Sequence, residues 1–294
     1  MSETIELFLL QISLIAVVLI LHTYLGLHII RRTLIFSDLV LDQLAALGAM
    51  VGVAIYANYA FSDNPVLARV AALCKYASPG SYVLAMAAVL FGSFLLALIK
   101  PKTRAIPREA VIGILYAMAL VVSLLLTDIV RSVEPYLTTT LSGCLLWVTW
   151  PLVSVTVVIY IVLLLFHYKL RYKFIALAEE PQTLKNEKLW DFLFFTTQGI
   201  ITVLIVPIAG VLLAYSFLMI PAAIAAMFTK KWAGAVLIGW SVGFVACVLG
   251  LGVSYFCNFP YGPTLVLSLG IFFVCAMILR CLLSRRSLNS KGCK

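Results

Sequence analysis

The residues most able to do chemistry in this sequence are two acidic side chains, Asp38 and Asp42, near the start of a long apolar stretch. Because they are four residues apart, both carboxylates lie on one face of a helix. Two like charges at that spacing repel unless a cation or a basic partner offsets them, which indicates a cation path or gate. Helix capping is the alternative, with Ser37 as N-cap and Arg31 and Arg32 nearby. We expect capping for Asp38 and leave both interpretations open for Asp42.

Few other polar side chains lie inside apolar stretches. His22 and His28 are six residues apart, so they do not share a helix face and are not expected to bind one ion together. Of the two, His22 lies deeper and is the better candidate ligand. Gln198 either lines a polar path or holds helices together. Pro221 removes one backbone hydrogen bond and is predicted to kink its helix, either for packing or to turn carbonyls toward an ion.

The composition indicates a helical integral membrane protein. Of the 294 residues, 64% are hydrophobic and 11% are charged, against about 25% charged in soluble domains. The mean hydropathy is +1.12, and the apolar runs are continuous rather than alternating. The net charge of +9 fits Lys and Arg in loops on one side of a membrane better than nucleic-acid binding. The sequence contains neither a C-x-x-C motif nor a P-loop motif, so no zinc knuckle and no ATPase site are predicted.

The apolar runs predict nine membrane-spanning helices within one domain, residues 1–294. The uncharged run 192–228 is too long for one crossing, so we divide it near 207–210. With the N-terminus outside, every Lys and Arg except Arg69, Lys75 and Arg131 then lies on the cytoplasmic side, together with the tail at 284–294. The predicted spans are 6–30, 37–59, 81–99, 110–127, 142–166, the two halves of 192–228, 232–256 and 264–283. A polar stretch is predicted at 60–80 and a short loop at 128–137.

Two motifs in the last third of the chain carry a family resemblance. The first is Leu218–Ala223, followed by Ala226 and Lys230; the second joins Gly250–Tyr255 to Pro260–Thr264. In this order and separation they resemble the permease subunits of zinc, manganese and iron ABC importers, with Asn258 in place of that family's Asp. The resemblance implies the membrane permease fold of a metal-type ABC importer.

The second span departs from that family. There the family carries an Asp and a His that bind the passing metal, and the corresponding positions here are Leu39 and Gln43. Asp42 with Gln43 is a hard, oxygen-rich pair, which suits manganese, magnesium or hydrated iron better than zinc. The predicted metal-contacting residues are Asp42, Asp38, Gln43 and His22.

The polar stretch 167–190 is predicted to be a cytoplasmic coupling loop. By resemblance it contains a short helix that docks into the partner ATPase, with Ala176, Ala178, Glu179 and Glu180 as the docking residues. A plain basic loop facing anionic lipid is the alternative.

The resemblance implies a transport subunit of the bacterial inner membrane rather than an enzyme. It implies a homodimer that works with two ATP-binding subunits and an extracytoplasmic substrate-binding protein, importing a divalent metal ion by alternating access. No cofactor is expected on this chain, and ATP is used by the partner. Two alternatives remain: a permease for a metal chelate or another small solute, which the missing His favours, and an ATP-independent secondary carrier. Against the carrier, the sequence has no evident inverted repeat.

Overall fold

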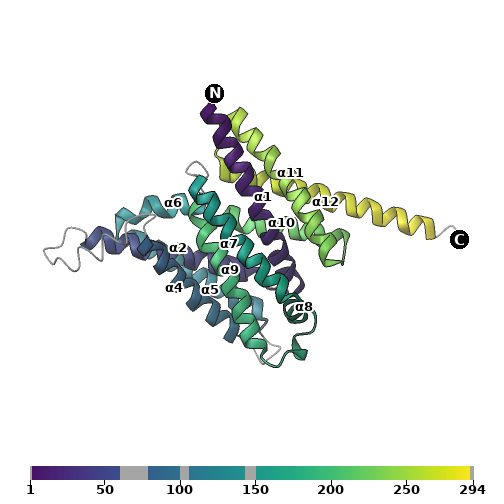
Figure 1. The fold of residues 1–294 in the computed structure, drawn as a ribbon, viewed down its shortest axis with the longest axis horizontal. Coiled ribbons are helices and arrows are strands. Elements are labelled where there is room, and N and C mark those ends of the chain that lie inside the picture. Colours follow the sequence, from purple (N-terminus) through teal and green to yellow (C-terminus); the bar gives the residue numbers. More distant parts are fainter. Residues whose placement is uncertain (1, 60–78, 100–105, 143–149, 292–294) are drawn as a thin grey trace.

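The computed structural model describes residues 2–59, 79–99, 106–142 and 150–291, and all regular structure within those ranges is helical (Figure 1). The helices are α1 (Ser2–Arg31), α2 (Phe36–Tyr59), α4 (Pro79–Leu98), α5 (Arg108–Ile129), η1 (Arg131–Val133), α6 (Glu134–Ser142), α7 (Trp150–Lys169), α8 (Arg171–Glu179), η3 (Pro181–Thr183), α9 (Glu187–Ala209), α10 (Val211–Phe228), α11 (Trp232–Cys257) and α12 (Tyr261–Lys291).

Eight of the described helices are long and apolar enough to cross a membrane: α1, α2, α4, α5, α9, α10, α11 and α12. A ninth candidate is α7 together with α8, a pair of helices that is bent by 71° at their junction. Counting this bent pair as one span gives the predicted number, and the all-α membrane fold is confirmed.

Three predicted boundaries are wrong. The span predicted at 142–166 corresponds to α7, described over Trp150–Lys169, and Ser142 belongs to a separate helix, α6; residues 143–149 lie outside the described part of the chain. The loop predicted at 128–137 is helical from Arg131, because Glu134 and Pro135 are favourable residues for the first turn of a helix. The predicted tail continues α12 to Lys291, since no Gly or Pro interrupts the chain between residues 271 and 291. Most of the stretch at 60–80 lies outside the described residues.

The long apolar run divides at one glycine. Gly210 has φ 80° and ψ 161°, a conformation that is open almost only to residues without a Cβ. It separates α9 from α10, and its amide N–H still bonds to the carbonyl of Val206 at 2.9 Å. The predicted division near 207–210 is therefore confirmed.

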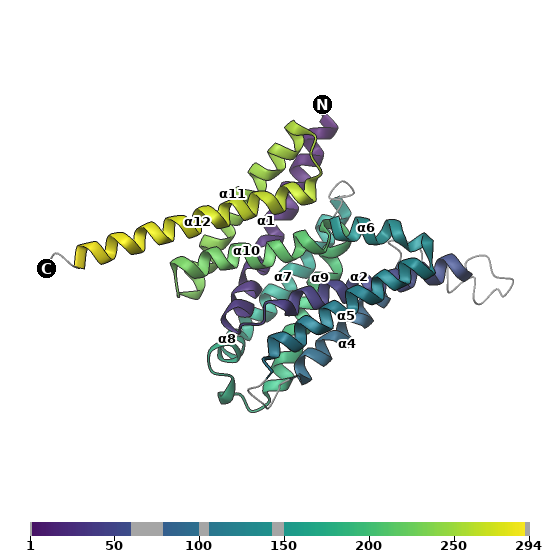
Figure 2. The same ribbon diagram turned by 180° about the vertical axis from the view of Figure 1, so that it is seen from behind.

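The helices form two groups, which Figure 1 and Figure 2 show from opposite sides. In the first group α1, α10, α11 and α12 pack on one another; in the second group α2, α4, α5 and α9 do so. The groups meet where α10 contacts α2 and α9, and α7 lies against α1. The candidate site lies in the second group, between α2 and α9.

Glycines bring α1 and α11 close to α10. A Cβ at Gly26 would collide with the carbonyl oxygen of Leu218, and one at Gly239 would lie 2.8 Å from the carbonyl oxygen of Pro221. The ring of Pro221 faces Gly243 in the same way. The structure keeps α10 as one helix through Pro221, with its ring and carbonyl packed against α11.

The second family motif, Gly250–Tyr255 with Pro260–Thr264, spans the end of α11 and the turn to α12. Asn258 ends the helix with φ 54° and ψ 36°, a left-handed conformation that Asn adopts more readily than most residues. The Ser254 hydroxyl donates to the carbonyl of Phe259 at 2.7 Å, and the Phe259 amide donates to the carbonyl of Ser254 at 3.1 Å. Asn258 therefore has a structural part in the turn to α12.

Candidate functional site

Two acidic side chains of α2 meet two polar side chains of α9 in matching order. Gln198 Nε2 donates to Asp38 Oδ1 at 2.7 Å, and Thr202 Oγ1 donates to Asp42 Oδ1 at 3.0 Å. Both pairs are four residues apart on their own helices, so α2 and α9 run parallel with their polar faces in register. All four side chains are buried. The structure thus brings Asp38 and Asp42 together on one face, as their spacing predicts.

The predicted N-cap at Ser37 is wrong, although Asp38 does lie in the first turn of α2. The helix begins at Phe36, one residue before Ser37, and the Ser37 hydroxyl donates to the carbonyl of Leu34 at 2.7 Å instead of capping an amide. The Glu109 carboxylate of α5 accepts the Phe36 amide at 2.9 Å and takes the place of a cap. Asp38 is therefore turned toward α9 rather than toward its own helix terminus.

The acidic pair has no basic partner among the residues that the structure describes, where Arg31 pairs with Glu179 and both Arg32 and Arg108 pair with Asp191. Asp42 Oδ2 and Gln198 Oε1 are buried and accept no hydrogen bond within the same residues. Unpaired buried charge is strongly unfavourable in a membrane interior. The arrangement is therefore suited to a positive ion that brings its own charge.

Gln43 points away from the pair. Its Nε2 donates to the Ser123 hydroxyl of α5 at 2.9 Å, whereas Asp42 faces α9. His22 lies on α1, in the other group of helices. Its Nδ1 bonds to the carbonyl of Val18 at 3.0 Å, and its ring stacks on Tyr160 with centroids 5.9 Å apart.

Tyr160 of α7 is buried next to His22. Its hydroxyl oxygen lies 3.4 Å from His22 Nδ1. The described residues contain no group of three or more His, Cys, Asp or Glu side chains that could hold a metal ion.

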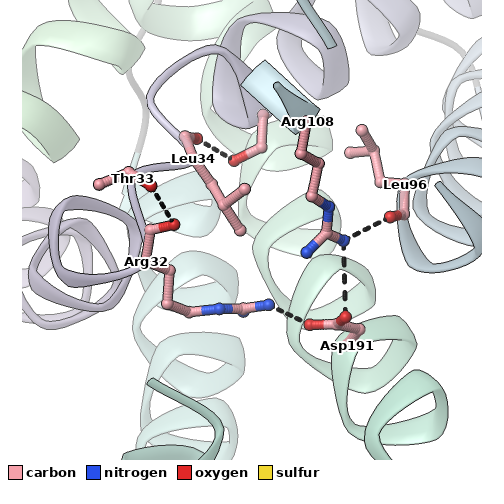
Figure 3. A network of polar contacts seen from close by, with 7 residues as sticks. Arg32, Thr33, Leu34, Leu96, Arg108 and Asp191 are labelled. Atoms are coloured by element: carbon pink, nitrogen blue, oxygen red, sulfur yellow. Dashed lines mark hydrogen bonds and ion pairs between the residues drawn. The ribbon is translucent and has the colours of Figure 1, made fainter. Parts of the chain in front are cut away.

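Another buried carboxylate, that of Asp191 on α9, has two arginine partners (Figure 3). Arg32 Nη2 donates to Asp191 Oδ1, and Arg108 Nη2 lies 3.5 Å from Asp191 Oδ2 while also donating to the carbonyl of Leu96 at 2.7 Å. Burial lowers the pKa of the Arg32 guanidinium from its ordinary value, and the Asp191 carboxylate opposes that shift. Asp191 precedes Gln198 by seven residues, so this network lies about 10 Å along α9 from the acidic pair.

The predicted docking residues lie on α8, at the end of the molecule where α1 and α7 end (Figure 1). Phe174 and Leu177 bury one face of α8, Ala176 and Ala178 are half-buried, and Glu180 is exposed.

Glu179 bonds within the chain. Its Oε1 accepts from Arg31 Nη1 at 2.5 Å and from Trp232 Nε1 at 3.0 Å. The Arg31 guanidinium also lies 3.8 Å from the centroid of the Trp232 ring. One carboxylate thereby ties the ends of α1 and α8 to the start of α11.

A family model described as the ABC 3 transport family matches residues 66–280, well over half of the chain. The chain belongs to the ABC 3 transport family. This confirms the relationship that the two motifs predict. The prediction of a multi-pass protein of the bacterial inner membrane is confirmed as well.

Characterised and uncharacterised relatives resemble this ABC 3 chain over part of its length. A probable metal transport system membrane protein of Chlamydia pneumoniae is 24% identical over 180 residues, which cover 58% of this chain and 60% of that protein. An uncharacterized membrane protein of Synechocystis is 26% identical over 181 residues, covering 58% and 63%. The manganese import system permease protein ScaB of Streptococcus parasanguinis is 27% identical over 195 residues, covering 64% and 69%. The chain thus matches less than two thirds of the length of the first two.

A solved structure shares the fold over nearly the whole chain. PsaBC from Streptococcus pneumoniae, solved in complex with Fab, superposes with a TM-score of 0.67 and 20% identity, covering 91% of this chain and 89% of that one. The ABC 3 chain therefore has the same helical fold as that protein.

The sequence reasoning missed several residues of the site. Thr202 follows Gln198 at the same spacing as Asp42 follows Asp38, so a search for matching polar pairs on two apolar helices would have found it. Asp191 falls between the predicted loop 167–190 and the apolar run that is predicted to begin at residue 192, whereas α9 already begins at Glu187. No signal in the sequence marks Tyr160, whose place beside His22 depends on how α7 packs.

Proposed function

We propose that this ABC 3 chain is the permease subunit of an ATP-driven importer of divalent metal ions, and that Asp38 and Asp42 contact the ion as it passes. The observation that carries the proposal is the buried acidic pair between α2 and α9, which has free oxygens and no cationic partner in the described part of the chain. Family membership and the names of two relatives, a probable metal transport protein and a manganese import permease, support it.

The donor atoms favour a hard ion. Asp42 Oδ2 and Gln198 Oε1 are both unpartnered oxygens, and Asp38 supplies a second carboxylate. Manganese, magnesium and ferrous ions accept oxygen ligands and retain water, whereas zinc prefers His and Cys. With only two carboxylates, an ion here keeps part of its hydration shell. Such incomplete capture suits a transport site, because the ion must also leave.

The buried Asp191 carboxylate closes the cytoplasmic side in this proposal. The positive-inside rule places the start of α9 and the α1–α2 turn at the cytoplasmic end. There Arg32 and Arg108 join three elements through Asp191 (Figure 3). Two arginines in the exit repel a divalent cation, so the path is shut inside while this network holds.

The partners belong to the same proposal. The sequence has no P-loop, so we infer that a partner subunit hydrolyses ATP and pushes on α8, with Ala176, Ala178 and Glu180 on or near its accessible side. Glu179 then passes the movement to α1 and α11 through Arg31 and Trp232. A second copy of the chain and an extracytoplasmic binding protein complete the assembly.

The test measures total cell metal by elemental analysis in a strain that lacks the chain. Wild-type chain, expressed with its neighbouring ATPase under metal starvation, is expected to restore one metal selectively. Asp42→Asn is expected to lower that recovery more than about tenfold, since a lost charged ligand is worth at least 1.4 kcal/mol. Asp128→Asn, at an exposed position near the end of α5, is the matched control and should retain transport.

A different outcome separates the alternatives. If Asp42→Asn assembles normally and transports as well as wild type, the acidic pair does not contact the cargo, and a permease for a chelate or another solute is favoured. If the chain restores the metal without any ATPase, the carrier alternative is correct.

A further inference from the structure

An open apolar groove of about 730 Å³ lies away from the acidic pair, between α1, α7, α8 and α11. Its walls are mostly aliphatic and aromatic side chains, among them Leu164, Leu165 and Leu237. Leu165 and Leu237 are 60% and 64% exposed, so the groove opens outward, where the chain meets the membrane.

The indole N–H groups of the groove wall are bonded within the protein, and the Tyr24 hydroxyl and His167 Nδ1, which have no partner among the described residues, are themselves buried. Trp232 Nε1 donates to Glu179, and Trp240 Nε1 donates to the carbonyl of Ala16 at 2.9 Å. His167 Nε2 pairs with the Thr197 hydroxyl at 2.9 Å. The two indole rings therefore present only their apolar surfaces, and the body of the groove suits a hydrocarbon chain.

One end of the groove is basic. Arg171 lines it at the bend between α7 and α8, and α11 begins at Trp232 directly after the exposed Lys230 and Lys231. Arg171 uses one amine to donate to Tyr172 at 2.9 Å, so most of its five N–H donors stay available. The helix α11 has no side-chain cap, which leaves the amides of its first turn for an anion.

We propose that this groove binds one anionic phospholipid of the cytoplasmic leaflet, with an acyl chain along the groove and the phosphate at Arg171. Trp232 and Trp240 are eight positions apart on α11, a rise of about 12 Å, which is close to the roughly 15 Å of hydrocarbon in one leaflet. The basic end lies at the cytoplasmic side, as the positive-inside rule requires.

Charge favours a lipid over a second copy of the chain. The chain carries a net charge of +9, and its predicted topology places nearly all of its Lys and Arg on the cytoplasmic side. A second copy would bring more positive charge to a mouth that is already basic, whereas an anionic headgroup offsets it.

The test uses the two groove tryptophans as reporters. The full chain, assembled with its ATPase, is reconstituted in phosphatidylcholine vesicles that contain brominated phosphatidylglycerol or, separately, brominated phosphatidylcholine at the same mole fraction. The background has Trp147, Trp150 and Trp190 replaced by Phe, which leaves Trp232 and Trp240 to be quenched. We expect the anionic lipid to quench at about fivefold lower mole fraction, the preference expected from one basic residue near the surface. The preference should shrink as salt rises.

Two variants with matched controls identify the two parts of the site. Arg171→Gln should remove the headgroup preference, while Arg280→Gln, on exposed α12, should keep it. Ala233→Phe, which fills the groove mouth, should reduce quenching by both lipids; Ala226→Phe, at an exposed site on α10, should not.

Two results would overturn the proposal. Equal quenching by both lipids, unchanged in Arg171→Gln, would mean that bulk lipid fills the groove without selection. No quenching by either lipid would mean that protein covers it, with a second copy as the occupant to test by cross-linking. Because the measurement is lipid contact rather than transport, neither result bears on the metal proposal.

Discussion

Helix α9 takes part in two buried acidic centres that have opposite surroundings. Asp191, at its cytoplasmic end, is held by Arg32 and Arg108. Two and three turns further along, Gln198 and Thr202 bond to Asp38 and Asp42, where no cation is present in the part of the chain that the structure describes. One centre is balanced by two arginines of the protein itself, and the other has no basic side chain beside it within the described residues.

The presence or absence of basic partners suits the two centres to different tasks, a structural one for Asp191 and, in the proposed function, a transport one for Asp38 and Asp42. A buried carboxylate with two arginines gains from a fixed geometry, and losing one partner leaves charge stranded in a medium of low dielectric. A buried pair of carboxylates without a cation is unfavourable until an ion arrives. In the proposed function, the first centre holds one closed arrangement, and a passing ion supplies the positive charge that the second centre lacks. Each prediction below tests this contrast.

The largest expected effect is the loss of Asp191. Asp191→Asn leaves Arg32 and Arg108 buried without a counter-charge, and should lower the free energy of unfolding by about 3–5 kcal/mol. Thermal unfolding of the detergent-solubilised chain measures it. Asp128→Asn, the exposed control, should stay within about 0.5 kcal/mol of wild type. Unchanged stability in Asp191→Asn would show that the network is not a structural centre.

Metal binding should act on the other centre alone. At a concentration about 100 times its Kd, the transported ion should stabilise wild type by about 2.7 kcal/mol. The stabilisation should vanish in Asp42→Asn and persist in Asp191→Asn. Manganese, magnesium and zinc chlorides are compared by the same unfolding assay. A shift that is equal in wild type and Asp42→Asn would place the ion elsewhere.

Removing one charge of the pair should stabilise the empty protein. In chelator, Asp42→Asn ends the repulsion with Asp38 and should raise the free energy of unfolding by about 1–3 kcal/mol, as Coulomb's law gives for charges about 6 Å apart at intermediate dielectric. The Asn oxygen can still accept from Thr202. The same Asp→Asn change should therefore raise the free energy of unfolding at position 42 and lower it at position 191. Changes of the same sign at both positions would contradict the proposed difference between the two centres.

The smallest effect is expected at Glu179, a partly exposed carboxylate paired with Arg31. Glu179→Gln keeps an acceptor for Trp232 and should lower stability by only about 0.5 kcal/mol, because solvent screens the ion pair. If this carboxylate couples α8 to α1, the number of ions transported per ATP hydrolysed should fall clearly below the wild-type value even though the protein is almost as stable. An unchanged ratio of transport to ATP hydrolysis in Glu179→Gln would show that Glu179 is not part of the coupling route.

The sequence predicts much of the fold because a membrane restricts the choice. Each apolar run must become a helix long enough to cross, and the charge asymmetry then orients them. The division at Gly210 follows from the same argument. The wrong boundaries fall at polar ends such as Ser142 and Asp128, where hydropathy does not distinguish a short helix from a loop.

Only the part of the site that lies within a single helix could be predicted from the sequence. The spacing of Asp38 and Asp42 fixes their common face, and adjacent residues differ by about 100°, which is why Gln43 turns to α5 while Asp42 turns to α9. The partners lie 160 residues away on α9, and nothing local in the sequence says which helices become neighbours. The same holds for Arg32, Asp191 and Arg108, which come from three elements.

The division into two groups of helices has a mechanical consequence. The chain passes between the groups at the residues 32–35 that join α1 to α2, and again at Gly210 between α9 and α10. Short joints of this kind let two bodies rotate against each other while every helix keeps its own hydrogen bonds. Arg32 lies in the first joint and is bonded to Asp191 of the second group. The segment about which the two groups could rotate therefore also carries an ion pair that opposes the rotation.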